Sequence, residues 1–395
     1  MKKVVILGAG YAGVRCALDL DRNGQGEIQV TLVNKHHYHQ FITQLHEPAA
    51  GGDFEDIRVS LAEIFSGAGV RLVKTTVTGI RPGDNRVLTE DGELDYDYLV
   101  VGLGGEPEFF GIPGLEEHSL TLRSLNSTRV IRTRIESAFA RYKADPSRDH
   151  LLTIVIGGAG FTGIELTGEL ADRLPELCKR YDIEQNKVNI INIEASPEIL
   201  SGYEADLAEA ARATLTAKGI RLITGTAIQE VRRNEVILSD GTVIKAGTIV
   251  WTGGVKASRL VAEAGFKAAG RGRAEVNEYL QAVDYPGVYI TGDSAFIKKT
   301  ETGEIMGPTA QVAIQSGHIA ALNILADLRG EEKRVFHPRE LGRVTTLGRK
   351  TAIGKIGDGF KLSGRPAGML KQLIKIKYLY SIGGLPQVLK HIHHL

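Results

Sequence analysis

Apolar residues along the chain form short, near-continuous runs that are followed by glycine-rich turns and then by residues with helical spacing. Val4–Leu7 is such a run, Val14–Leu20 has apolar positions at helical spacing, and a second run covers Ile28–Asn34. The same order returns later, with apolar runs at Thr153–Ile156 and Val188–Ser196. Uninterrupted runs are typical of parallel strands that are buried on both faces. The pattern therefore predicts two strand–turn–helix–strand units.

Three further apolar runs end in small residues, and turn-rich stretches lie before two of them. The runs cover Tyr98–Pro107, Thr248–Gly254 and Gly287–Ala295. Residues 70–99 and 220–250 are rich in strand-forming residues and contain Asp-Gly turns, so we expect a small antiparallel insert in each unit. The predicted fold class is α/β, with two Rossmann-like, doubly wound dinucleotide-binding domains.

The two glycine-rich turns are copies of one another. Val5–Gly13 and Val155–Gly163 share six identities in nine positions. In each GxGxxG copy the first glycine permits a tight turn, the second lets the backbone approach a pyrophosphate, and the third allows the helix to pack closely on the strand. A strand before and a helix after each turn make both copies specific signals. We therefore predict two dinucleotide sites on one chain.

The residues that end the second strand of each unit differ. Val188–Ile193 runs into Glu194, whose carboxylate is placed to accept both hydroxyls of an adenosine ribose and would repel a 2′-phosphate. No Lys or Arg occurs from 195 to 211 to bind such a phosphate, which favours NADH over NADPH. The first unit has Asn34 followed by Lys35 at this place, so that ribose contact is weaker there.

A later motif indicates which unit holds a flavin. Asp293 follows a strand in GVYITGDSAF, where its carboxylate is placed to bind ribityl hydroxyls; the alternative is a turn or cap residue. A helix is expected to open near Pro308, and its positive N-terminal end would stabilise an anionic reduced flavin. The residues expected to bind FAD are Gly8, Gly10, Tyr11, Ala12, Gly13, Asn34, Lys35, Thr43, Val77, Gly102, Leu103, Gly104, Asp293, Ala310 and Gln311. Those expected to bind NADH are Gly158, Gly160, Phe161, Thr162, Gly163, Glu165, Glu194, Gly253 and Gly254.

Composition narrows the classes of protein. The 395 residues are 43% hydrophobic and 24% charged, as in an ordinary soluble globular protein, and the net charge of +1 gives no argument for nucleic acid. The two cysteines, Cys16 and Cys178, form no CxxC pair and are expected in the core, which fits a reducing compartment. No apolar stretch reaches 18 residues, so no membrane-spanning segment is predicted.

Over residues 1–330 the two fingerprints, the YLVVGLGGEP and TIVWTGG strand ends and the late TGDSA resemble the flavoprotein superfamily with two dinucleotide-binding domains. Within it, GGAGFTGIEL, AQVAIQ and the basic C-terminal region resemble the type II NADH dehydrogenases, which are single-subunit NADH:quinone oxidoreductases. The segment HHYHQFITQLHEPAAGG has no cysteine and none follows Cys178, so the thiolate chemistry of disulfide reductases and sulfide:quinone oxidoreductases is excluded.

The resemblance implies a hydride transfer from NADH to FAD and then a two-electron transfer to a membrane quinone, with menaquinone expected. It places Glu165 beside the contact of nicotinamide and flavin, whereas the alternative is a carboxylate that merely favours its helix dipole. It places Gln311 and Gln315, four residues apart on one helix face, at the quinone, where the alternative is a solvated polar pair. Lys371 and Ile374 are further quinone candidates. A homodimer is also implied.

The C-terminal region is expected to bind an anionic lipid surface. Met369, Leu370, Leu373, Ile374 and Tyr378 recur at helical spacing within residues 367–392, with Lys371, Gln372 and Lys375 on other faces. Such a helix lies in the membrane plane, so we expect a peripheral protein at the cytoplasmic face of the cell membrane; the alternative is a helix packed on the protein core or in a dimer. Truncation before Arg365 is expected to release the protein from liposomes and to leave flavin reduction by NADH largely unchanged.

The expected domains are an FAD-binding domain at 1–112 and 280–332, an NADH-binding domain at 113–279 and a membrane-anchoring region at 335–395. Two other functions stay open: a soluble NADH-dependent flavin reductase that serves a protein partner such as ferredoxin, and an NADH-responsive signalling flavoprotein. The histidines at positions 36, 37, 39 and 46 have no acidic or cysteine partners at metal-ligand spacing, so no metal site is predicted.

Overall fold

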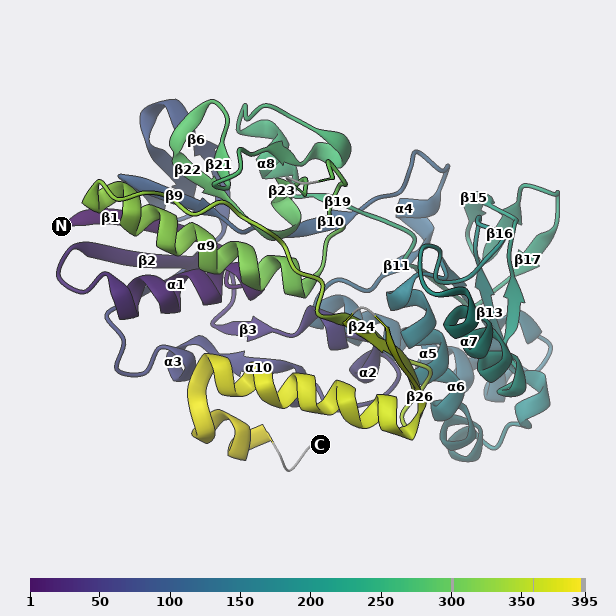
Figure 1. Ribbon diagram of the computed structural model, residues 1–395. Helices are drawn as coiled ribbons and strands as arrows, with labels where there is room; N and C mark the ends of the chain where they lie inside the picture. The colour runs from purple at the N-terminus through teal and green to yellow at the C-terminus, as the bar shows by residue number, and fades with distance from the viewer. Residues whose placement is uncertain (300–301, 358, 392–395) are drawn as a thin grey trace.

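Two parallel sheets form the two lobes of the molecule in the computed structural model, which describes residues 1–299, 302–357 and 359–391 (Figure 1). The first sheet draws strands from both ends of the chain and is parallel except at β21. Its order is β21 (Gln281–Ala282), β22 (Tyr285–Ile290), β9 (Tyr98–Val101), β1 (Lys2–Leu7), β2 (Ile28–Asn34) and β5 (Arg71–Lys74). The second sheet is parallel throughout, with the order β11 (Leu120–Thr121), β18 (Thr248–Trp251), β12 (Thr153–Gly157), β13 (Asn189–Ile193) and β14 (Arg221–Ile223).

The two sheets repeat one register around their central strands. Val5 lies beside Thr31 in the first sheet, and Val155 lies beside Ile191 in the second. Each apolar run is buried along its strand, as expected for strands covered on both faces. The duplicated sequence pattern therefore became a duplicated fold, and the predicted fold class of two Rossmann-like units is confirmed.

Helices cover the sheets, and α1 and α6 begin at the two glycine turns. In the first lobe, Gly317 of α9 approaches α1 so closely that a Cβ on it would lie 2.2 Å from the Ala12 carbonyl oxygen. The main helices are α1 (Tyr11–Asn23), α5 (Leu125–Ala144), α6 (Phe161–Tyr181), α7 (Ala205–Ala217) and α9 (Ala310–Arg329). The short ones are α2 (His46–Ala49), α3 (Leu61–Ile64), α4 (Leu115–His118) and α8 (Arg259–Glu263).

Small sheets complete both lobes, and the two predicted antiparallel inserts are among them. The first insert is β6 (Val77–Arg81), β7 (Arg86–Thr89) and β8 (Gly92–Asp95); the second is β15 (Ile228–Arg232), β16 (Glu235–Leu238) and β17 (Val243–Lys245). The two-stranded pairs are β3 (Tyr38–Gln40) with β4 (Arg58–Ser60), β10 (Gly105–Pro107) with β19 (Val255–Ala257), and β20 (Ala274–Glu275) with β23 (Ala295–Phe296).

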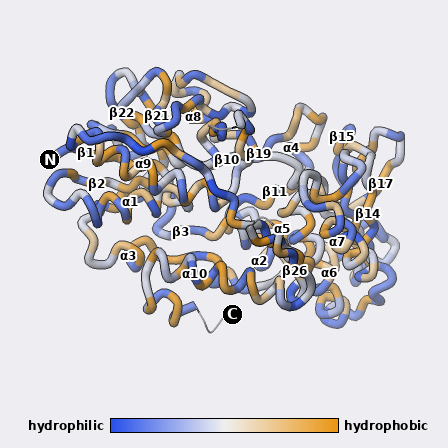
Figure 2. The backbone as a smooth tube through the Cα atoms, viewed as in Figure 1, coloured by the Kyte–Doolittle hydropathy of each residue, from blue (hydrophilic) through white to orange (hydrophobic). Residues whose placement is uncertain are grey.

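After α9 the chain crosses from one lobe to the other and returns. The hydrophilic stretch at 331–341, seen in Figure 2, leads to the three-stranded sheet of β24 (Gly342–Thr346), β25 (Ala352–Ile356) and β26 (Phe360–Gly364). Helix α10 (Arg365–His391) then runs back along one side of both lobes (Figure 1), with a break at Gly384, where φ is 65° and ψ is −159°. Its Leu379, Ile382 and Val388 belong to the core of the first lobe. Ile392, the end of the expected helix, lies outside the described residues.

Candidate functional site

The two glycine turns have the same backbone shape. Gly8 and Gly158 both lie in the left-handed region, at φ values of +93° and +99°. A Cβ at Gly8 would lie 2.5 Å from the Gly102 carbonyl oxygen, and one at Gly158 would lie 2.8 Å from the Cα of Gly253. Both conformation and space therefore demand glycine at the first position of each turn.

In each turn, the third glycine is needed for close packing, whereas the second faces open space. A Cβ at Gly13 or at Gly163 would lie about 2 Å (1.9 and 2.0 Å) from the carbonyl oxygen of the first glycine. A Cβ at Gly10 or at Gly160 would meet nothing within 4 Å. Each open space faces the N-terminus of α1 or α6, where no side chain caps the helix and no acidic residue lies in the first turn. Uncapped N–H groups beside open space fit the pyrophosphate of a dinucleotide at each turn.

The ribose positions differ as the sequence indicated. Asn34 Oδ1 accepts a hydrogen bond from Ala9 N at 3.1 Å, and Glu194 Oε2 accepts one from the equivalent Ala159 N at 2.7 Å. Glu194 Oε1 accepts a second bond from Ser196 N at 2.9 Å. Both side chains thus stand at the same place in their turns, and only the second carries a negative charge to meet ribose hydroxyls.

Asp293 lies where the chain passes from β22 towards α9. It follows Gly292, whose N–H donates to Ser316 Oγ of α9 at 3.1 Å. Burial raises the pKa of Asp293, and the nearby Arg273 opposes this shift. A cavity of about 110 Å³ is lined by Val255, Lys256, Arg271, Arg273, Asp293, Ile305, Met306, Gly307 and Pro308. Asp293 and Ile305–Pro308, the residues that precede α9, therefore line one cavity.

The remaining expected flavin residues lie in the first lobe. The Thr43 and Tyr11 hydroxyls are 2.9 Å apart, which joins the first glycine turn to the segment after β3. Lys35 is exposed, Val77 begins β6 and packs against the first core, and Leu103 and Gly104 follow β9. Among the expected NADH residues, Phe161 and Thr162 begin α6 in the second lobe, and Gly254 follows β18. The binding roles of these residues stay predictions.

Glu165 lies in a buried cluster drawn from three parts of the chain. Its side chain, on α6, is an ion-pair partner of Lys371 on α10, and its Oε1 accepts a bond from Thr346 N of β24 at 3.3 Å. Its Oε2 lies 3.5 Å from His46 Nδ1 of α2. Burial raises the pKa of Glu165, but Lys371, His46 and these hydrogen bonds together hold it below its ordinary value. Glu165 is therefore an ionised, buried carboxylate.

Two titratable neighbours of Glu165 were missed in the sequence. His46 is buried, and burial lowers its pKa to about 4, so the ring is neutral at pH 7. Glu47 Oε1 lies 4.0 Å from His46 Nε2, and burial raises the pKa of Glu47 to about 7 while Lys375 and Lys371 oppose the rise. The sequence feature that could have indicated this site is the His46–Glu47 pair, which stands between Leu45 and the apolar Pro48–Ala50. Titratable residues within such a stretch indicate a buried polar site.

Gln311 and Gln315 both contact the main chain that follows α9. Gln311 Nε2 donates to the Gly342 carbonyl at 2.5 Å, and its Oε1 accepts from Leu341 N at 3.0 Å. Gln315 makes the same reciprocal pair with Arg339, with both distances 2.9 Å. Both amides therefore hold the main chain after α9, and their binding of a quinone stays a prediction.

Near its start, helix α10 turns two lysines inward and several apolar residues outward. Lys375 is buried and Lys371 faces Glu165, whereas Met369, Leu373 and Ile374 are between half and 70% exposed (69%, 60% and 51%). Tyr378 also faces inward, so its place on the outer apolar stripe was wrong; Tyr380 is exposed there. The Glu47 and Glu165 carboxylates attract the Lys371 and Lys375 ammonium groups. The apolar residues on the opposite side of this part of α10 are therefore left exposed.

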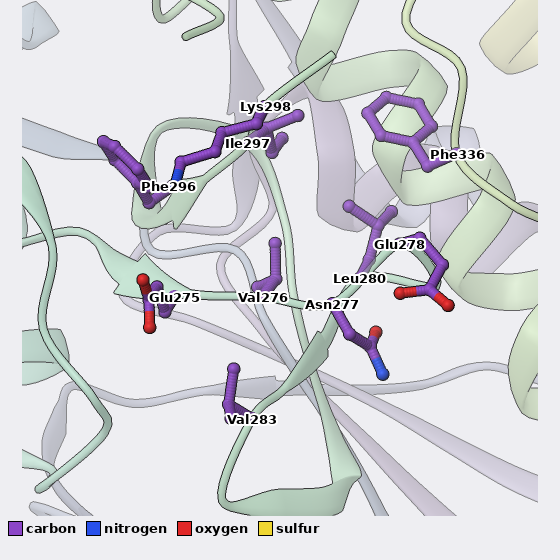
Figure 3. A pocket seen from close by; sticks show the side chains of 10 residues that line it. All are labelled: Glu275, Val276, Asn277, Glu278, Leu280, Val283, Phe296, Ile297, Lys298 and Phe336. Carbon is purple, nitrogen blue, oxygen red and sulfur yellow. The ribbon is translucent and has the colours of Figure 1, made fainter. Parts of the chain in front are cut away.

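One cavity in the described part of the chain lies away from both turns. It measures about 350 Å³ (Figure 3) and is lined by Glu275, Val276, Asn277, Glu278, Leu280, Val283, Phe296, Ile297, Lys298 and Phe336. None of the predicted nucleotide or quinone residues lines it. The described part of the chain holds no group of three or more His, Cys, Asp or Glu side chains that could bind a metal. Within that same part, Cys16 and Cys178 are buried free thiols, as expected.

Comparison with known proteins agrees with this geometry. The profile of the pyridine nucleotide-disulphide oxidoreductase family matches residues 2–317. A type II NADH:quinone oxidoreductase of Staphylococcus aureus is 37% identical over 393 residues, which cover 97% of this chain and 96% of the relative. The structure of NDH2 from Plasmodium falciparum in complex with NADH superposes with a TM-score of 0.88 at 17% identity, covering 99% of this chain and 97% of that one. A sulfide:quinone oxidoreductase from Aquifex aeolicus has the same fold, with a TM-score of 0.79 at 22% identity over 97% of this chain and 92% of that one. The chain therefore belongs to the pyridine nucleotide-disulphide oxidoreductase family and, within it, to the type II NADH:quinone oxidoreductases.

Proposed function

We propose that this chain is an FAD-dependent NADH:quinone oxidoreductase, which catalyses NADH + H⁺ + quinone → NAD⁺ + quinol without pumping protons. The observation that carries the proposal is the pair of open glycine turns, of which only the second ends at a carboxylate, together with the buried Glu165 that connects the second turn's helix to α10. Bound FAD would supply the redox chemistry, since it accepts a hydride and passes on two electrons.

The chain's own residues bind and orient the two nucleotides. The α1 N-terminus, Asn34 and Asp293 would hold FAD, and the α6 N-terminus and Glu194 would hold NADH. Residues 1–112 and 280–332 would then form the FAD-binding domain, and 113–279 the NADH-binding domain. The carboxylate of Glu194 would repel a 2′-phosphate, which selects NADH over NADPH.

Glu165 and Lys371 would act where the reaction takes up its proton. Reduction of a quinone to a quinol needs two protons, and NADH brings only one of them as hydride. The Lys371 ammonium is paired with the Glu165 carboxylate, so this pair would hold a proton beside the quinone, and a proton taken up from solvent would replace it after transfer. Gln311 and Gln315 would donate amide hydrogen bonds to the quinone carbonyls, and Ile374 would form an apolar wall. We expect menaquinone as the physiological acceptor.

The outer face of α10 would meet the membrane that holds the quinone. Met369, Leu373, Ile374, Tyr380 and Leu385 are exposed along it, while Lys371 and Lys375 of the same helix face inward. An exposed apolar face over buried charge favours an apolar environment outside. No helix in the described residues is long and apolar enough to cross a membrane. We infer a peripheral protein, bound through residues 335–395 to anionic lipid at the cytoplasmic face of the cell membrane.

Leu373→Glu tests the lipid surface. This variant should lose most co-sedimentation with liposomes that contain anionic lipid, because a charge would enter the buried apolar layer. Val130→Glu is the matched control, since Val130 is 51% exposed on α5, on another helix. Equal binding of both variants would contradict the assignment of α10.

We also propose a homodimer, for which light scattering should give twice the chain mass of 42.8 kDa.

Anaerobic double-mixing stopped-flow absorbance at the flavin band tests the reaction itself. NADH should bleach the flavin, NADPH should bleach it far more slowly, and a short-chain menaquinone should restore the colour rapidly. Bleaching without recovery on quinone, but with recovery on a ferredoxin, would replace the proposal by a soluble flavin reductase. Absence of bleaching by either nucleotide would contradict both functions.

A further inference from the structure

The peptide between Ala9 and Gly10 is held differently from its counterpart in the second turn. In the second turn, the Ala159 carbonyl accepts a hydrogen bond from Leu200 N at 2.8 Å, so the same lobe holds it with its own backbone. In the first turn, the Ala9 carbonyl accepts from His39 Nδ1 at 2.8 Å. The N–H groups of Ala9 and Ala159 have equivalent partners, Asn34 and Glu194. The carbonyl is therefore the point where the two turns diverge.

His39 is in turn held by the C-terminal helix. The Tyr378 hydroxyl of α10 lies 2.9 Å from His39 Nε2. Burial lowers the pKa of His39 to about 4, with the bond to Ala9 acting the other way, so the ring carries one proton at pH 7. A carbonyl only accepts, so this proton is on Nδ1, and Tyr378 must donate to the bare Nε2. The chain of bonds has one direction, from Tyr378 through His39 to the Ala9 carbonyl.

The orientation of the Ala9 carbonyl also fixes the direction of the Gly10 N–H group. The Ala9 carbonyl and the Gly10 N–H belong to one planar trans peptide and point in opposite directions. Gly10 is the glycine at which a Cβ would enter open space before α1. Tyr378 also packs against Tyr11, the first residue of α1, with ring centroids 5.0 Å apart. Tyr378 of α10 thus reaches the Ala9 side of the Gly10 N–H through His39 and contacts Tyr11 on the other side directly.

We propose that Tyr378 is a positioning residue of the flavin site, which aims the Gly10 N–H through His39 and makes FAD retention depend on the C-terminal helix. This inference rests on the proposed function only in that FAD binds the first turn. It replaces the expectation that residues from Arg365 onward are separable: removal of α10 would also remove Tyr378 from the flavin turn. The second turn has no such dependence, because Leu200 holds it.

The test is FAD release from purified holoenzymes on dilution, followed by the fluorescence of free FAD. Tyr378→Phe removes one hydroxyl and leaves His39 Nε2 without its donor, so the dissociation constant of FAD should rise about tenfold. The dissociation constant of NADH should stay within about twofold, because the second turn is unchanged. Tyr380→Phe is the matched control, since Tyr380 is 63% exposed two residues away, and it should change neither constant.

Nitrogen NMR of the His39 ring gives a readout that a general loss of stability would not move. Wild type should show a protonated Nδ1 and a hydrogen-bonded bare Nε2, and Tyr378→Phe should shift only the Nε2 signal. Unchanged FAD release in Tyr378→Phe, or equal weakening of FAD and NADH, would overturn the inference. Failure of the proposed function has a different signature, because wild-type protein would then bind FAD without quinone reduction, or would bind no FAD at all.

Discussion

The two dinucleotide turns have nearly the same backbone and different surroundings. At the same helix position, five residues after the second glycine, the first turn has Arg15 and the second has Glu165. Arg15 pairs with Asp19 one turn along its own helix, whereas Glu165 pairs with Lys371 from another part of the chain. The ribose position is neutral Asn34 in one and charged Glu194 in the other. A duplicated fold thus gained two functions through a few side chains and through one added helix, α10.

The largest expected effect is at the position where the turns differ in charge. Glu165→Gln would remove the carboxylate that pairs with Lys371, which should lower the unfolding free energy by roughly 3–5 kcal/mol and slow quinone reduction. Chemical denaturation and stopped-flow absorbance would measure both. The double variant Glu165→Gln/Lys371→Met should recover most of the stability without the activity. A stable single variant at full activity would show that the Glu165–Lys371 pair is dispensable.

The second prediction compares glycines within one turn. Gly160→Ala places a methyl group in the open space before α6, so the dissociation constant of NADH should rise about a hundredfold, while the melting temperature stays nearly unchanged. Gly10→Ala should do the same to FAD. Gly163→Ala is the contrasting control, because its methyl would collide with the Gly158 carbonyl and should destabilise the fold. Tight NADH binding by Gly160→Ala would contradict the placement of the NADH pyrophosphate at that turn.

A swap of the ribose residues sharpens the comparison further. Glu194→Asn offers an amide oxygen as acceptor, as Asn34 does to Ala9 N, and removes the charge together with one methylene and the acceptor of Ser196 N. We expect the dissociation constant of NADH to rise about tenfold and the preference over NADPH to narrow. Asn34→Asp, the reverse change in the first turn, should leave NADH binding as it is. Titrations with NADH and NADPH would check this, and an unchanged preference for NADH would contradict the role of Glu194 in binding the ribose.

The smallest effect concerns the neutral histidine beside Glu165. The pKa of His46 is about 4 in the folded chain and 6.5 when unfolded, so the unfolded state takes up a proton first as pH falls. The unfolding free energy should therefore decrease by about 1 kcal/mol between pH 7 and pH 5.5 on account of His46. His46→Gln should remove this part of the pH dependence. Parallel curves for variant and wild type would contradict a neutral His46.

Sequence reasoning worked where the chemistry is local. The shape of Gly8–Gly13 and Gly158–Gly163 depends on residues within one turn, so spacing alone predicted it. The inward lysines of α10 could not be predicted, because their acidic neighbours Glu47 and Glu165 lie more than 200 residues away in the sequence. Tyr378 was misplaced for the same reason. Its ring suits a membrane interface by composition, and its inward partners, His39 and Tyr11, are more than 300 residues away in the sequence.

A crystal structure of the holoenzyme with NADH bound tests the central claim most directly. The account predicts the FAD pyrophosphate in the open space at Gly10 and the NADH pyrophosphate at Gly160, with both adenosine ribose hydroxyls of NADH within hydrogen-bond distance of Glu194. The nicotinamide should then lie between the flavin and Glu165. NADH density at the first turn, or a ribose of NADH that does not reach Glu194, would contradict the assignment of the two turns.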